Sequence, residues 1–130
     1  MSDLNDWMVP DVALQTVEEH VSPDGRLRFI VVAAPDGDLA LGFDGYPSHT
    51  HADILASLSG LTAADAARQF VDDLLSDKSV IAVWGVPGRV DDVWVSEDPA
   101  SDAAYPQAGE VIELRYWSGR PWDGLKASAP

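Results

Sequence analysis

The chain has 130 residues, of which 22 are Asp or Glu and 8 are Lys or Arg, giving a formal net charge of −14 at neutral pH. A chain this acidic lacks the basic surface that would bind nucleic acids or anionic membranes. The absence of cysteine excludes disulfides, thiolate metal sites and a cysteine nucleophile. No apolar run reaches membrane-spanning length, and residues 1–10 lack the features of a signal peptide. We therefore expect one soluble, cytoplasmic domain over 1–130, with frayed ends at 1–10 and 125–130.

Three strands are predicted in the first third of the chain, at residues 12–20, 26–34 and 39–43. Two turns of Pro-Asp-Gly sequence separate them, and proline followed by glycine favours chain reversal. Residues 44–52 contain Gly, Pro and two His without periodicity, which predicts a loop that runs into a short helical turn at 52–58.

The clearest element is a helix predicted over residues 62–76. Thr62 is the candidate N-cap, and Asp65 completes a capping-box pattern three residues later. Apolar residues recur with helical spacing and form one stripe, made of Ala63, Ala66, Ala67, Phe70, Val71, Leu74 and Leu75. An amphipathic helix of this kind is expected to lie across one face of a sheet.

Three more strands are predicted at residues 79–84, 90–95 and 110–117, with an irregular loop over 96–109. Strands joined by short turns pair antiparallel. The sequence therefore predicts an α+β fold: a single two-layer domain with a mostly antiparallel sheet of about six strands and one main helix packed on one face.

The segment Ser-His-Thr-His-Ala-Asp is the sharpest candidate for chemistry. In an extended segment His49 and His51 point to the same side, and Asp53 lies two residues further on. Neutral imidazole and carboxylate are ligands for zinc or another divalent metal. The pattern is similar to the HxHxDH signature of metallo-β-lactamase-like hydrolases, but Ile54 stands where that signature has its last histidine. The competing interpretations are a hydrogen-bonded polar loop and a binding surface.

The same histidine pair is also similar to the motif of JAMM-type metallopeptidases. Ser59 follows at the required distance, but Thr62 stands where that motif has its third ligand, an aspartate. The resemblance implies a catalytic base upstream, which would be Glu18 or Glu19. A small metal-dependent hydrolase is therefore kept as the alternative function.

Aromatic residues give a second indication. Four of the five tryptophans lie in the last third of the chain, and most are expected to pack the sheet against the helix. Trp122, together with Arg120 and Tyr116, is a candidate for an exposed patch instead. Tryptophan, tyrosine and arginine are the residue types enriched at the energetic centres of protein interfaces.

Two strings, GFDGYPSHTH over 42–51 and ELRYWSG over 113–119, resemble small acidic bacterial proteins that are uncharacterised or associated with polymorphic-toxin immunity. The resemblance implies a non-enzymatic single domain whose acidic face blocks a cationic toxin. The positions it would mark are Asp44, His49, His51, Arg115 and Trp117.

The leading hypothesis is a non-enzymatic interaction protein that binds a basic protein partner through its acidic surface and needs no cofactor. The candidate contact residues are Asp44, His49, His51, Arg115, Trp117, Arg120 and Trp122. The alternative is the hydrolase that binds zinc or another divalent metal through the His49, His51 and Asp53 cluster. A homodimer formed through an apolar sheet face is the third hypothesis.

Overall fold

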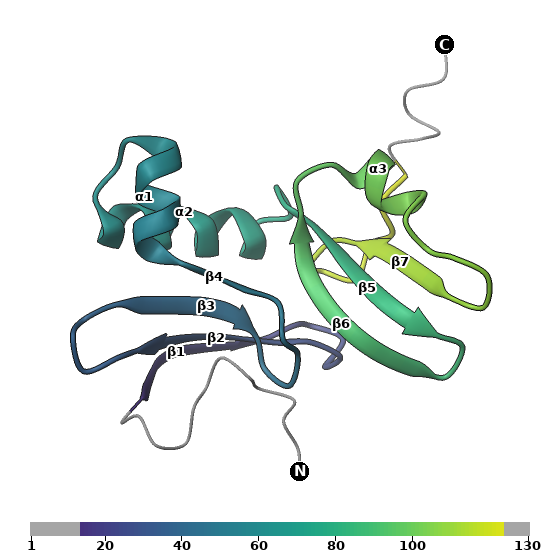
Figure 1. The fold of residues 1–130 in the computed structure, drawn as a ribbon, viewed down its shortest axis with the longest axis horizontal. Helices are drawn as coiled ribbons and strands as arrows, with labels where there is room; N and C mark the ends of the chain where they lie inside the picture. Colours follow the sequence, from purple (N-terminus) through teal and green to yellow (C-terminus); the bar gives the residue numbers. More distant parts are fainter. Residues whose placement is uncertain (1–13, 124–130) are drawn as a thin grey trace.

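The computed structural model describes residues 14–123, which form an α+β fold with two antiparallel sheets (Figure 1). In chain order the elements are β1 (Gln15–Val21), β2 (Arg28–Ala33), β3 (Leu39–Phe43), β4 (His49–His51), α1 (Ala52–Ser59), α2 (Ala63–Leu75), β5 (Val80–Val86), β6 (Arg89–Ser96), α3 (Pro99–Ala103) and β7 (Val111–Arg115). The first sheet has the order β1-β2-β3-β4 and the second the order β6-β5-β7. The predicted ends at 1–10 and 125–130 lie outside the described residues.

The α+β class is confirmed, but the single sheet of about six strands is wrong, because the strands divide into sheets of four and three. The division follows from the order of the elements. After β4 the chain enters two helices, and β5 then pairs with β6 on one side and with β7 on the other. Both edges of β5 are occupied, so the strands of the second half form a sheet of their own.

The helix predicted over 62–76 is observed as α2, within one residue at each end. The Thr62 hydroxyl accepts a hydrogen bond from the backbone N–H of Asp65 at 3.1 Å, as the capping pattern predicts. Four residues of its predicted apolar stripe are buried, namely Ala66, Ala67, Val71 and Leu74, whereas Ala63 at its start is exposed. The half-buried Phe70 ring stacks on Phe29 of β2 with centroids 6.0 Å apart. This helix therefore packs onto the first sheet.

Two predicted loops contain regular structure. Residues 49–51 pair with β3 as the short strand β4, and α1 is a helix of eight residues where only a helical turn was expected. Residues 99–103, within the predicted loop 96–109, form α3, which the Asp98 carboxylate caps by accepting from the Ser101 N–H. The sequence patterns miss β4 and α3 because these elements have too few residues for a periodic pattern.

The main core lies between the two sheets and beneath α2. Its buried residues come from β2, β3, α2, β5 and β6, and include Phe29, Leu41, Phe43, Val71, Leu74, Ile81, Val83 and Val93. A smaller cluster of Ile30, Val32 and Ala40 lies on the opposite face of the first sheet. No helix within residues 14–123 combines the length and apolar character needed to span a lipid bilayer.

Candidate functional site

An open groove of about 720 Å³ lies between the two sheets, a volume in the range of ligand-binding sites. We call it the inter-sheet groove. One wall comes from β3, β4, α1 and α2, and the other from β6 and the segment around α3. Figure 1 shows β6 as the strand of the second sheet that lies nearest to β3 and β4. The groove thus exists only because the chain forms two sheets.

The wall formed by the first sheet and the helices is apolar. Phe29 and Phe43 meet edge to face with centroids 5.1 Å apart, and Leu55 and Phe70 extend this surface from the helices. On α1 the apolar surface continues into solvent, where Leu58 is 76% exposed and Ile54 is 49% exposed. Exposed apolar side chains that continue a groove are typical of a protein-binding surface.

Asp92 fixes one end of the groove. Its carboxylate accepts a hydrogen bond from the Ser48 backbone N–H at 3.2 Å and another from the Ser48 hydroxyl. Ser48 immediately precedes β4, and Asp92 lies in β6, so this contact ties the first sheet to the second. The tie holds the two walls at a fixed separation.

Asp102 and Tyr105 form a second polar part of the inter-sheet groove. The Asp102 carboxylate accepts hydrogen bonds from the Trp94 indole N–H at 3.1 Å and from the Ser96 hydroxyl at 2.6 Å. The Tyr105 ring meets Trp94 edge to face with centroids 6.2 Å apart, and Tyr105 is 56% exposed. A carboxylate beside two aromatic rings is an environment that suits a cationic side chain.

The negative charge of the groove is not neutralised within the described residues. Each of the six arginines forms an ion pair with a carboxylate, and none of these carboxylates belongs to Asp92, Glu97 or Asp102. These three acids line the groove. A basic ligand can therefore bind them without displacing an internal arginine.

The two predicted histidines lie together on β4. His49 pairs with Gly42 and His51 with Ala40, so both rings lie on the same face of the sheet, with centroids 5.0 Å apart. The His49 Nδ1–H donates to the Pro47 carbonyl at 2.9 Å, and the His51 Nδ1–H donates to the Asp38 carboxylate at 3.0 Å. His49 lines the groove at its rim.

The predicted third ligand, Asp53, lies exposed in the first turn of α1. Within residues 14–123 no three His, Asp or Glu side chains converge as a metal ion would require. The candidate bases lie on β1, three strands from β4, where Glu18 bonds to His20 and Arg68, and Glu19 bonds to Arg28. The metal-dependent hydrolase therefore stays a prediction from the sequence that no observation here favours.

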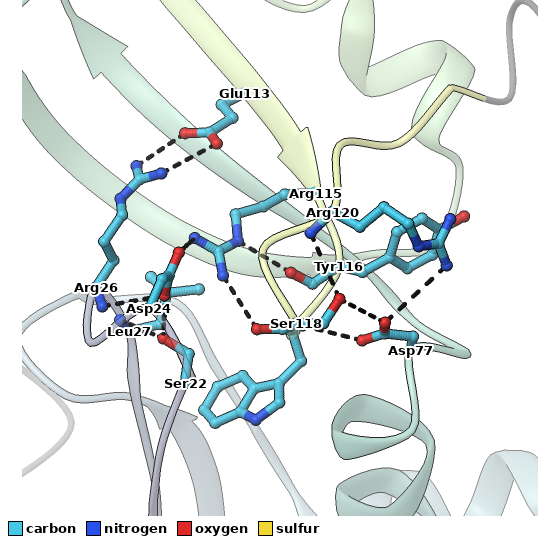
Figure 2. A network of polar contacts seen from close by, with 11 residues as sticks. Ser22, Asp24, Arg26, Leu27, Asp77, Glu113, Arg115, Tyr116, Ser118 and Arg120 are labelled. Carbon is cyan, nitrogen blue, oxygen red and sulfur yellow. Dashed lines mark hydrogen bonds and ion pairs between the residues drawn. The ribbon is translucent and has the colours of Figure 1, made fainter.

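Arg115 and Trp117 are internal residues, 0% and 6% exposed. The Arg115 guanidinium donates to Asp24 at 2.7 Å, to the Tyr116 carbonyl at 3.0 Å and to the Trp117 carbonyl at 3.1 Å. Figure 2 shows Arg115 between Asp24 and Tyr116. The hydrogen bond from Arg115, followed by that from Ser22, holds the pKa of Asp24 far below its usual range. In the folded protein neither Arg115 nor Trp117 offers its side chain to a partner.

The other predicted contact residues lie apart from the groove. Asp44 is half-buried and pairs with Arg28 at 3.3 Å. The Arg120 guanidinium lies over the Tyr116 ring, 4.1 Å from its centroid, and 4.0 Å from the Asp77 carboxylate. Arg120 and Tyr116, two members of the predicted exposed patch, are thus in contact, and the Arg120 side chain is 57% exposed. Half-buried Trp122 is likewise absent from the groove lining.

Sequence reasoning missed most of the groove. Asp92, Glu97, Asp102 and Tyr105 carry its polar character, and they lie in a strand or in the segment predicted to be an irregular loop. The available signal was the pair of adjacent aspartates between valines in a predicted strand. That signal could not show what lies opposite the strand.

Comparisons with known proteins give no match to a family model, to a curated protein or to a solved structure. The class of protein is therefore defined by the fold and the site: a small acidic α+β domain of two antiparallel sheets with an acidic groove between them. The resemblance to immunity proteins stays an expectation from the sequence.

Proposed function

We propose that this chain is a non-enzymatic interaction protein that binds a basic segment of a partner protein in the inter-sheet groove. One observation carries the proposal: Asp92, Glu97 and Asp102 line an apolar groove without an arginine or lysine partner among residues 14–123, although every arginine of the chain is paired elsewhere.

The two kinds of surface have different physical roles. Burial of apolar and aromatic surface such as Phe70 and Leu58 supplies affinity, because each square ångström of apolar surface removed from water contributes about 25 cal/mol. The carboxylates accelerate encounter with a basic partner and select against acidic ones. The fixed arginine pairs keep the protein's own cations from competing for the groove.

The proposed partner is a protein because a basic segment with apolar residues satisfies both surfaces at once. The net charge of −14 disfavours nucleic acids and anionic membranes as alternatives. In the setting that the sequence resemblance implies, the partner is a cationic toxin in the cytoplasm, and stoichiometric binding neutralises it.

The test uses a short capped peptide in which Arg and Val alternate, titrated into the protein in a calorimeter. We expect Glu97→Lys to weaken binding at least about tenfold, because a cation then faces the cationic peptide. The control is Asp123→Lys, which makes the same charge change at an exposed residue outside the groove lining. Binding should also weaken as NaCl is raised from about 50 to about 300 mM.

If Glu97→Lys and Asp123→Lys lower the affinity for the peptide equally, the peptide is attracted to the acidic protein in general. That result would overturn the groove as the binding site. A peptide that fails to bind the wild-type protein at low salt would overturn the proposal itself. A matching peptide in which Glu and Val alternate should give no heat of binding.

A further inference from the structure

The inter-sheet groove is bordered by two end strands. β4 is the last strand of the first sheet and β6 is an end strand of the second. Both line the groove, β4 through His49 and Thr50, and β6 through Asp92, Trp94 and Val95. An end strand carries a row of backbone N–H and C=O groups that are not used by its own sheet.

We infer that the partner segment binds in extended form and adds to the free edge of β6 as a further strand of the second sheet. This inference rests on the proposed function, and it specifies the backbone conformation and the residue pattern of the segment. Recognition would then combine main-chain hydrogen bonds with alternating side-chain contacts.

β6 is the better edge of the two. β4 has three residues and leads directly into α1, whereas β6 has eight. The irregularity in the pairing of β6 lies near its start, beside Gly85, and the pairing from Asp92 to Ser96 is regular. At about 3.3 Å per residue this regular part is about 17 Å long. At its start the Val93 N–H already donates to the Asp92 carboxylate, so the edge available for pairing lies over the residues after Val93.

The other end strands carry features that protect an edge. The pairing of β1 shifts register around Val17, and a bulge of this kind distorts the strand against further pairing. At the end of β7, Pro121 forms a bridge to Arg115. Of the two end strands that border the inter-sheet groove, β6 therefore has the longer regularly paired part.

The two sides of β6 define which side chains the added strand carries. Trp94 pairs with Ala82 and lies on the same side as Tyr105 and the Asp102 carboxylate. The next residue, Val95, points to the other side and packs against the main core. Both sides line the groove, so side chains of an added strand point alternately to an acidic, aromatic wall and to an apolar wall.

The inferred occupant is therefore an extended segment in which basic and apolar residues alternate. Basic side chains would reach Glu97 and Asp102 beside the aromatic rings. Apolar side chains would reach the wall formed by Leu55 and Phe70. The tie between Ser48 and Asp92 marks the end at which the added strand must stop.

The test compares four peptides on the wild-type protein. They are the alternating Arg-Val peptide, a peptide of the same composition with the arginines and valines in two blocks, and two alternating peptides with N-methyl groups on every second amide, one methylated at the arginines and one at the valines. We expect the block peptide to bind at least about tenfold more weakly. Alternate amides of an extended peptide point to opposite edges, and only one edge of the peptide faces β6. N-methylation of the amides on that edge should therefore weaken binding by a similar factor, whereas N-methylation of the other amides should not. Amide hydrogen exchange should slow at Val95, because alternate N–H groups of β6 face its outer edge and that of Val93 already donates to Asp92 Oδ1 at 2.8 Å, and exchange should stay unchanged in β7.

The outcomes separate this inference from the proposed function. If the block and N-methylated peptides bind as well as the alternating peptide, while Glu97→Lys still weakens binding, strand addition is wrong and the groove remains the site. If both sets of N-methylated amides weaken binding equally and exchange in β6 is unchanged, strand addition is also wrong. If no peptide binds, both proposals fail.

Discussion

The Nη1 atom of Arg115 donates a hydrogen bond to the Oδ2 atom of Asp24 at 2.7 Å, across the junction between the two sheets. Arg115 ends β7 in the second sheet, and Asp24 lies in the turn between β1 and β2 in the first. Figure 2 shows a second pair beside them, in which Arg26 donates to both oxygens of Glu113. These contacts and the tie between Ser48 and Asp92 fix how the sheets face each other, and so they fix the groove.

Arg115→Lys should lower the free energy of unfolding by about 3–5 kcal/mol, because the buried guanidinium makes three hydrogen bonds that one ammonium cannot reproduce. Urea unfolding followed by fluorescence measures the loss. The control is Arg89→Lys, whose side chain is 68% exposed beside Asp91 and whose replacement should leave the free energy of unfolding essentially unchanged. Similar losses in both variants would contradict the structural role of Arg115.

The stabilisation that Asp24 contributes should depend on pH. The hydrogen bond from Arg115 lowers the pKa of Asp24 in the folded protein below its value in the unfolded chain. Its contribution is therefore complete above the unfolded pKa of about 3.9 and is lost as the pH falls towards the folded value. The gap in unfolding free energy between wild type and Asp24→Asn should narrow as the pH is lowered from about 6 to about 3. A gap that is constant over this range would contradict the linkage.

Gly85→Ala should destabilise the β5–β6 hairpin, because a Cβ atom at Gly85 would overlap the backbone carbonyl oxygen of Arg89. We expect a loss of about 3 kcal/mol, measured by urea unfolding. Gly85→Asn should lower the free energy of unfolding by at least as much. By contrast, Gly25 has a φ of 74° and open space around it, so Gly25→Asn should be tolerated. A well-tolerated Gly85→Asn would show that the hairpin backbone shifts freely.

Leu58→Ser should separate binding from stability. Because this side chain is 76% exposed, the free energy of unfolding should change by less than about 0.5 kcal/mol. Binding of the alternating Arg-Val peptide should weaken by about fivefold, since apolar surface at the groove is lost. Val21→Ser makes a comparable change at a 57% exposed residue of β1 outside the groove lining, and binding should be unchanged. Equal binding by Leu58→Ser and wild type would remove α1 from the binding surface.

Local patterns were enough to predict α2 and most strands. The apolar stripe from Ala66 to Leu74 and the Thr62 cap are encoded within a few turns of chain, and the hairpin strands follow from alternation and turn residues. The patterns failed for β4 and α3, which are too short to show a period. They also failed for Arg115, whose place in an alternating strand with Glu113 predicts an exposed side chain.

The sequence by itself determined the α+β class, the acidic character and the main helix, because these depend on composition and on residues close together in the chain. Only the tertiary structure decided that the strands form two sheets, that Arg115 is buried against Asp24, and that Asp92 and Glu97 face α1 across a groove. Each of these depends on contacts between distant segments. Such contacts depend on which strand edges remain open after neighbouring strands have paired, and the periodicity of the sequence does not predict them.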